Sequence, residues 1–290
     1  MIFTQTISAT HTMILIADSG STKTDWRFID SQNHVSQGRT AGFNPFFQTS
    51  QAIYEQICAS LLPLIKEQVS SVYFYGAGCA GAGSAVMRDA LRQAFEGAQI
   101  EVESDMLGAA RGACGRTAGI ACILGTGANN GLYDGSNVVA NVPSLGFWLG
   151  DEGSGGYLGK TLVVSYLHRE LPTDLMTAFE KRFSAIDRTE VLENAYQKPF
   201  PNRYFASFSK FLFDHRSHPF AYQMIYDAFA VFLKKYVCKH PQHKTLPVSF
   251  VGSVAFYYSD ILRQAAADQG VSVKNILEAP IAGLTLYHQG

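Results

Sequence analysis

The chain has few charged side chains and almost no excess of either sign. Asp, Glu, Lys and Arg make up 16% of the 290 residues, and the formal net charge is −1. This balance argues against nucleic acid or an anionic membrane surface as a partner, because both favour a basic protein surface. No run approaches the roughly 18 apolar residues of a transmembrane helix, and residues 1–12 lack the basic and apolar regions of a secretion signal. We therefore expect a protein without membrane contact, with a loose tail over residues 1–12.

Paired cysteines are absent as well. The odd number of cysteines and their scattered positions, without a C-x-x-C pair, predict reduced thiols in a cytoplasmic protein. The same pattern argues against a cysteine-based zinc or iron–sulfur site. The five are Cys58, Cys79, Cys114, Cys122 and Cys238. What the chain does have is apolar residues, at 47% of the total. At this length, that content predicts a well-buried globular protein with two lobes of roughly 100–150 residues each.

The segment Asp18–Asp25, with the sequence DSGSTKTD, joins two apolar runs that we expect to be strands, over residues 13–17 and 26–30. It has neither the G-x-x-x-x-G-K-[ST] spacing of a P-loop nor the G-x-G-x-x-G spacing of a Rossmann loop. A hairpin of this composition can offer backbone N–H groups, hydroxyls and Lys23 to a phosphate, with Asp18 at its mouth for a metal ion. A hairpin turn without any ligand has the same composition, so this segment alone leaves both interpretations open.

A similar hairpin follows about 105 residues later, over residues 119–135. An apolar strand again enters a Gly/Thr loop, here Gly125-Thr126-Gly127, and a short strand leaves it. The repetition predicts two similar lobes, each with one hairpin loop, so that a triphosphate could lie between them. A third junction, Gly252-Ser253 after the strand over residues 247–251, offers backbone N–H groups to a nucleotide, but it is also an ordinary strand-to-helix connection.

Two acidic segments are candidates for the chemistry. Asp105 follows a predicted strand over residues 100–103 and precedes a helix over 106–114, with Ser104 as N-cap. It could merely complement the helix dipole, but the carboxyl ends of strands are where α/β sheets bind ligands. Asp151 and Glu152 lie among glycines, so they either begin the helix over 157–169 or clamp a pair of substrate hydroxyls, with the indole of Trp148 nearby for stacking.

The remaining residues predict mostly packing. Residues 172–240 have helical periodicity, with Thr173 and Thr189 as expected N-caps and Pro201 at the start of a third helix. We further expect a helix over 256–267 and a strand over 271–274.

Together these segments make the chain resemble the actin/hexokinase/Hsp70 ATPase superfamily, and within it the N-acetylglucosamine kinase group of the BadF/BadG/BcrA/BcrD ATPase family. Residues 18–25 are similar to the first phosphate motif, 124–130 to the second and 251–254 to the adenosine motif. The segment 150–154 is similar to one that is more specific to the sugar-kinase branch. The resemblance extends over nearly the whole chain from Met13 onward.

The resemblance implies a duplicated α/β actin-like (ribonuclease H-like) fold, with two lobes and a central cleft between them. The first lobe would comprise residues 13–116 with a C-terminal helix over 279–290, and the second residues 117–278 with a helical insertion. The implied reaction is phosphoryl transfer from Mg²⁺-bound ATP to the 6-hydroxyl of N-acetylglucosamine. Glucosamine, N-acetylmuramic acid and a BadF-type ATPase activator remain alternatives, and a homodimer stays open.

The resemblance also implies a role for particular residues. Asp105 corresponds to the catalytic base and Asp18 to the metal ligand. The ATP and phosphate contacts would be Ser21, Thr22, Lys23, Thr24, Gly125, Thr126, Gly127, Gly252 and Ser253. The sugar contacts would be Asn44, Gly78, Cys79, Asp105, Thr126, Gly127, Trp148, Asp151 and Glu152. Competing families fit less well: an iron–sulfur activator needs closely placed cysteines, and the ROK sugar kinases carry a zinc motif that is absent from this sequence.

Overall fold

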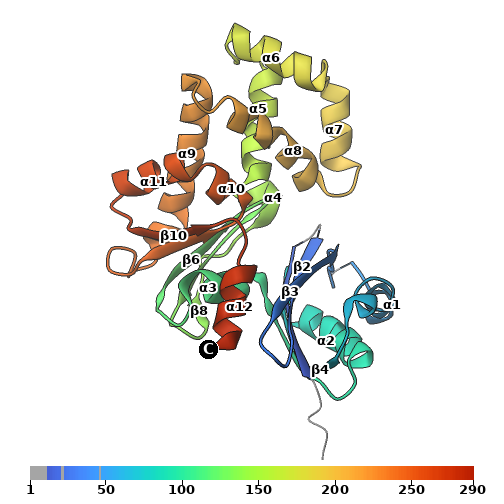
Figure 1. Cartoon of the computed structure of the whole chain (residues 1–290). Coiled ribbons are helices and arrows are strands. Elements are labelled where there is room, and N and C mark those ends of the chain that lie inside the picture. Colours follow the sequence, from blue (N-terminus) through green and yellow to red (C-terminus); the bar gives the residue numbers. More distant parts are fainter. Residues whose placement is uncertain (1–11, 21–22, 46) are drawn as a thin grey trace, which may run out of the picture. The chain divides into compact units, whose positions relative to one another are not determined.

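The computed structural model describes residues 12–20, 23–45 and 47–290 (Figure 1). The expected tail therefore lies outside the described residues except for Thr12, and so do Ser21 and Thr22. The chain forms two compact units: residues 1–108 with 281–290, and residues 109–280. No helix in the described part of the chain is long and apolar enough to cross a membrane.

The first unit is built on a five-stranded mixed sheet of order β3-β2-β1-β4-β5. The first three strands form an antiparallel meander, and β4 and β5 extend the sheet in parallel with β1. Helices α1 and α2 pack together on one face, and α12 packs on β1 and β2 (Figure 1). The elements are β1 (Thr12–Ser19), β2 (Lys23–Ile29), β3 (Val35–Ala41), α1 (Ser50–Ser60), η1 (Leu62–Leu64), β4 (Gln68–Gly76), α2 (Ala82–Ala94), β5 (Gln99–Ser104), α3 (Asp105–Cys114) and α12 (Ile281–Gln289).

The second unit has a sheet of the same topology, with the order β10-β9-β6-β7-β8. Its middle strands β6 and β9 are almost entirely apolar because helices cover them. Six α-helices and the short 3-10 helix η2 lie between β8 and β9 (Figure 1). The elements are β6 (Gly119–Leu124), β7 (Ala128–Tyr133), β8 (Val138–Ala140), α4 (Gly146–Leu149), α5 (Gly155–Leu167), α6 (Thr173–Phe183), α7 (Arg188–Tyr196), α8 (Pro201–Asp214), α9 (Pro219–Lys235), η2 (Val237–Lys239), β9 (Val248–Val251), α10 (Ser253–Tyr257), α11 (Ser259–Asp268) and β10 (Val273–Leu277).

The repeated order of strands confirms the duplicated α/β fold. In each unit an antiparallel meander of three strands is continued by two parallel strands, and each fifth strand leads into a helix, α3 or α12. The first unit ends inside α3 at Gly108, earlier than the expected boundary at residue 116. The end of α3 packs with the second unit for two reasons. A Cβ at Gly112 would lie 2.7 Å from Pro280, so helix and chain are in close contact there. In addition, Asn275 donates a hydrogen bond to the Ala113 carbonyl at 2.8 Å.

Some predicted element ends were wrong. Helix α7 is capped by Asp187, which accepts a hydrogen bond from the Glu190 N–H at 2.8 Å, and not by Thr189. Helix α6 begins at Thr173 itself, after Pro172, without a side-chain cap. The helix expected over residues 256–267 is two helices that meet at Tyr258, whose hydroxyl donates to the Ser209 carbonyl at 2.5 Å. Strand β10 begins at Val273, two residues later than expected.

Candidate active site

The carboxyl ends of β1, β4 and β5 bring the acidic candidates of the first unit together. Asp18 pairs in register with Tyr75 of β4, and Gly76 of β4 pairs with Ser104 of β5, next to Asp105. Asp105 begins α3, and the Ser104 hydroxyl accepts a hydrogen bond from the Leu107 N–H at 3.2 Å, so Ser104 caps the helix as expected. The Asp18 and Asp105 carboxylates therefore lie at the same edge of the sheet, where its parallel strands end.

Burial changes the acidity of these carboxyl groups. It raises the pKa of Asp18 from 3.8 to about 7, and the negative charges of Asp25 and Asp105 add to the effect. Burial also raises the pKa of Asp105. The Cys79 thiol is in the same surroundings: burial and the Asp105 charge raise its pKa to about 12. Raised pKa values of this kind, in which burial disfavours the charged form, are typical of functional sites.

The hairpin between β1 and β2 has an ion-pair network that the sequence did not predict. Lys23 lies 2.7 Å from Asp25, and Arg39 of β3 lies 2.8 Å from the other carboxylate oxygen. Burial alone would raise the pKa of Asp25, but these two cations outweigh it and lower that pKa. The cross-strand pairing of Asp25 with Arg39 follows from the register of β2 and β3, which the sequence leaves unspecified.

Thr24 faces inward in this hairpin. Its side chain is fully buried and shares a hydrogen bond of 2.7 Å with the Ser19 hydroxyl, which also accepts from the Phe43 N–H at 3.3 Å. This geometry ties the hairpin to the loop that precedes α1. A phosphate contact by Thr24 stays a prediction.

Two candidate sugar contacts of the first unit, Asn44 and Gly78, belong to loops that meet at Gly83. A Cβ at Gly83 would lie 2.0 Å from the Gly78 carbonyl and 3.3 Å from Pro45, so the loop of Asn44 and the turn of Gly78 lie next to each other. The Asn44 carbonyl accepts hydrogen bonds from Phe47 and Gln48, which closes its turn. Cys79 is 2% exposed and packs in the core, and its N–H donates to the Gly76 carbonyl at 3.1 Å. A sugar contact by Cys79 stays a prediction.

In the second unit, three predicted motifs meet at the end of β6. The Gly155 and Gly156 N–H groups donate to the Gly125 and Thr126 carbonyls at 2.8 and 3.0 Å. Gly252, which follows β9, lies against the same loop: its φ is 123°, and a Cβ there would lie 2.3 Å from the Leu124 carbonyl oxygen. Only glycine fits this position, and the close approach joins the Gly252-Ser253 junction to the Gly/Thr hairpin.

Asp151 is held against that hairpin in a strained conformation. Its φ is 60°, and its carboxylate accepts hydrogen bonds from the Ala128 N–H at 3.2 Å and the Ser144 hydroxyl at 3.5 Å. Burial raises its pKa despite these bonds. The left-handed region is unusual for a residue other than glycine and is often found at functional sites. Lys160 of α5, which donates to the Phe147 carbonyl at 3.1 Å, contributes positive charge nearby.

Glu152 and Trp148 have protein partners. The Glu152 carboxylate is buried and accepts hydrogen bonds from Lys235 and from the Tyr236 hydroxyl. The Trp148 indole is 49% exposed and stacks on Tyr196, with ring centroids 5.2 Å apart. Substrate contacts by Glu152 and Trp148 stay predictions.

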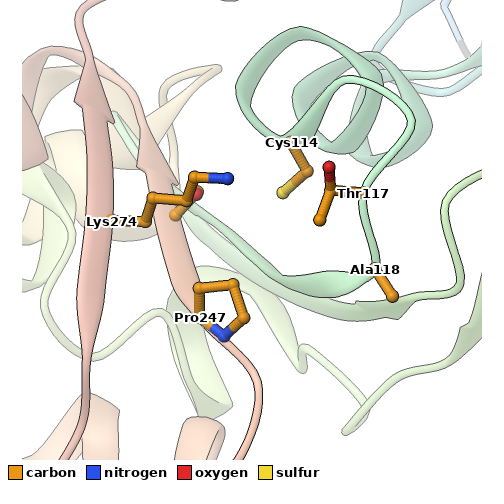
Figure 2. A pocket seen from close by; sticks show the side chains of 6 residues that line it. Cys114, Thr117, Ala118, Pro247 and Lys274 are labelled. Atoms are coloured by element: carbon orange, nitrogen blue, oxygen red, sulfur yellow. The ribbon is translucent and has the colours of Figure 1, made fainter.

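A small crevice in the second unit lies away from these motifs (Figure 2). It lies beside Cys114 at the end of α3, with Lys274 on its opposite side. Its other lining residues precede or begin strands, namely Thr117, Ala118, Pro247 and Ser249. Because the predicted ligand motifs follow the other ends of β6 and β9, this crevice is separate from them. In the described residues no three His, Cys, Asp or Glu side chains cluster as metal ligands.

No protein-family model and no curated protein matches the chain, but solved structures do. A structure from Porphyromonas gingivalis, named as a "Putative N-acetylglucosamine Kinase", is 41% identical, with a TM-score of 0.90 over 95% of this chain and 98% of its own. A structure of the same description from Chromobacterium violaceum is 19% identical, with a TM-score of 0.73 over 97% and 99% of the two chains. A ROK family glucokinase from Streptomyces griseus, in complex with glucose and AMPPNP, is 17% identical, with a TM-score of 0.57 over 96% and 100%.

The two more distant structures share the fold, whereas the similarity to the Porphyromonas gingivalis protein extends through the sequence of nearly the entire chain. The duplicated sheets, the two Gly-containing hairpins and the strand-end carboxylates agree with this relationship. The chain belongs to the ATP-dependent sugar kinases of the actin/hexokinase/Hsp70 superfamily.

Proposed function

We propose that this sugar kinase transfers the γ-phosphoryl group of ATP to the 6-hydroxyl of N-acetylglucosamine, with Asp105 as the general base. The observation that carries the proposal is the place of Asp105 at the end of β5, on the same sheet edge as Asp18, where burial also raises the pKa of its carboxyl group. A base works best when its pKa approaches the working pH, so burial makes Asp105 a stronger base than an ordinary carboxylate. The choice of sugar is supported by the similarity to the Porphyromonas gingivalis structure, which is named as an N-acetylglucosamine kinase.

Phosphoryl transfer depends mainly on positioning and charge stabilisation. In the proposal Asp105 orients the sugar hydroxyl and accepts its proton as the new O–P bond forms. Lys23 and the backbone of residues 125–127 hold the phosphates, with Gly252 and Ser253 beside the nucleotide. Asn44, Gly78, Cys79 and Asp151 hold the sugar, together with Thr126, Gly127 and the Trp148 ring.

The donor set around Asp18 fits a magnesium ion. A carboxyl group with a pKa of about 7 is half protonated at neutral pH, and a bound divalent cation would favour its ionised form. Mg²⁺ prefers oxygen ligands and commonly uses one or two carboxylates together with substrate phosphates and water. Bound there, the ion would neutralise part of the triphosphate charge. Asp18 is the residue proposed to hold it.

The proposal is tested by measuring ADP release with a panel of hexoses and N-acetyl amino sugars. N-Acetylglucosamine should give the highest kcat/KM, and the phosphorylated position should be the 6-oxygen by NMR. Preference for glucosamine or N-acetylmuramic acid would move the assignment to that amino sugar. If no sugar stimulates ADP release, the proposed substrate class is wrong.

The role of Asp105 is tested by Asp105→Asn, which keeps the shape of the side chain and removes the base. We expect kcat to fall by roughly 10²–10⁴-fold, while the Kd of ATP changes little because the nucleotide contacts are elsewhere. Asp89→Asn, on the exposed side of α2, is the matched control. Turnover within threefold of the wild type in Asp105→Asn would remove Asp105 as the base.

A further inference from the structure

The segment from Gly150 to Gly153 packs against the C-terminal end of helix α9. A Cβ at Gly153 would lie 3.0 Å from the Phe232 Cβ, and a Cβ at Gly150 would lie 3.1 Å from the Tyr236 hydroxyl oxygen. Gly153 has a φ of 77°, so it needs glycine for its conformation as well as for space. The loop that carries Asp151 thus has contacts with α9 on both sides of Asp151.

Glu152 joins this loop to the helix end through both of its carboxylate oxygens. Lys235 donates to one oxygen, and the Tyr236 hydroxyl donates to the other at 2.7 Å. Burial would raise the pKa of Glu152, but these hydrogen bonds outweigh it and lower the pKa, so the carboxylate stays ionised. The Glu152 side chain is 7% exposed, whereas that of Lys235 is 58% exposed. Glu152 is therefore committed to protein partners and has little surface left for a ligand.

Tyr236 contacts the residues on both sides of Asp151. Its hydroxyl is bonded to Glu152 and lies against Gly150, while Asp151 between them has the left-handed φ of 60°. Such a conformation costs an aspartate free energy and persists only where its surroundings fix it. The same conformation directs the Asp151 carboxylate to the Ala128 N–H of the Gly/Thr hairpin.

We propose that Tyr236 and Lys235 are positioning residues for the sugar: through Glu152 they hold Asp151 in the conformation in which its carboxylate can bind a substrate hydroxyl. This inference rests on the proposed function, and it replaces a direct sugar contact by Glu152 with an indirect role. Because the network acts on Asp151 and not on Asp105 or the nucleotide contacts, its loss should weaken sugar binding much more than phosphoryl transfer.

The test compares Tyr236→Phe and Lys235→Met with the wild type in steady-state kinetics. We expect the KM for N-acetylglucosamine to rise roughly tenfold or more in each variant, the effect of losing a hydrogen bond to a charged group. The KM for ATP should stay within twofold and kcat within threefold. Lys235→Arg keeps the charged donor and should restore most of the sugar affinity. A general loss of structure would instead change all three constants together.

Two other residues on α9, one adjacent to Lys235 and one near the start of the helix, provide controls. Lys234→Met makes the same charge change at the adjacent exposed lysine, and Tyr222→Phe removes a hydroxyl from a tyrosine that stacks on Tyr226. Both controls should keep the wild-type sugar KM. If Glu152→Gln raises the sugar KM while Tyr236→Phe and Lys235→Met stay within twofold of the wild type, Glu152 contacts the sugar directly and the inference is overturned.

Amide hydrogen exchange separates this inference from the proposed function. In Tyr236→Phe and Lys235→Met, the amides of residues 150–156 should exchange about tenfold faster than in the wild type, with no such change in the two controls. This measurement needs no substrate, so it decides the anchoring role even if the wild type proves to use another sugar. Unchanged exchange in both variants would refute the anchoring role, whereas a failed sugar panel would refute only the choice of substrate.

Discussion

Asp18 should make the protein less stable in the absence of a cation. The native pKa of about 7 exceeds the unfolded value of 3.8, so the native state retains a proton that the unfolded state releases. Below pH 4 both states are protonated and the group has no effect on stability. As the pH rises from 4 to 7, the native state loses stability relative to the unfolded state, and above pH 7 the loss is constant. The difference between the two pKa values corresponds to roughly 4 kcal/mol at most.

The substitution Asp18→Asn removes this ionisation at almost constant shape. We expect the variant to be more stable than the wild type by roughly 2–4 kcal/mol at pH 8, by about two fifths as much at pH 5, and by little below pH 4. At about 2–4 °C per kcal/mol for a protein of this size, the Tm at pH 8 should rise by several degrees. Under the proposed function the same variant should lose ATP turnover.

Thermal unfolding of the wild type, Asp18→Asn and Asp89→Asn at pH 4, 5, 6.5 and 8, without divalent cations, measures the effect. Asp89→Asn should follow the wild-type curve, since Asp89 is exposed on the surface of α2. The reasoning about Asp18 is refuted if Asp18→Asn is no more stable than the wild type at pH 8, or if the difference between their Tm values does not change from pH 5 to pH 8.

Three further outcomes follow from single contacts. Burial lowers the pKa of His240, so the native state resists a proton that the unfolded state accepts near pH 6.5. The protein should therefore become less stable as the pH falls below that value. In urea unfolding at pH 5 and 7, His240→Gln should weaken this pH dependence. Gly252→Ala should raise the KM for ATP and lower the Tm, because its Cβ would lie 2.3 Å from the Leu124 carbonyl; wild-type values for both would contradict this. The Tyr75 hydroxyl is 2.8 Å from the Nε2 atom of His288. Tyr75→Phe should therefore lower the free energy of unfolding in urea by about 1 kcal/mol. No change would mean that this hydrogen bond contributes nothing to stability.

The sequence predicts the fold well where glycine and hydroxyl residues interrupt apolar runs. The two hairpins, the helix that begins at Asp105 and the repeated topology could all be predicted because the signals are local and occur twice. The ends of elements were less predictable. Tyr258 divides a stretch with helical periodicity. Its hydroxyl donates a hydrogen bond to Ser209 of α8, a residue that no local pattern connects to it.

The environments of the candidate site residues depend on contacts that are distant in sequence. Asp151 and Glu152 are adjacent and have similar chemistry, yet Asp151 faces the Gly/Thr hairpin while Glu152 is bound by the end of α9. The sequence separation between Glu152 and Tyr236 is 84 residues. The sequence indicates which carboxylates are present. Only the packing of α9 against the loop distinguishes Glu152, which has partners at the end of α9, from Asp151, which contacts the hairpin.

The two copies of the repeat have diverged in chemistry while their topology stayed the same. Strand β1 ends in Asp18 and Ser19, whereas β6 ends in Ile123 and Leu124, so the second copy has no carboxylate at this place. The carboxylate of the second unit comes instead from the insertion between β8 and β9, where Asp151 reaches the hairpin through the Ala128 N–H. A strand-end carboxylate beside a second acid suits a cation, as at Asp18. The Asp151 carboxylate is instead fixed by the Ala128 N–H and the Ser144 hydroxyl, and we propose that it binds a substrate hydroxyl. The duplication thus provides two similar scaffolds, and the insertion places a carboxylate beside the hairpin of the second one.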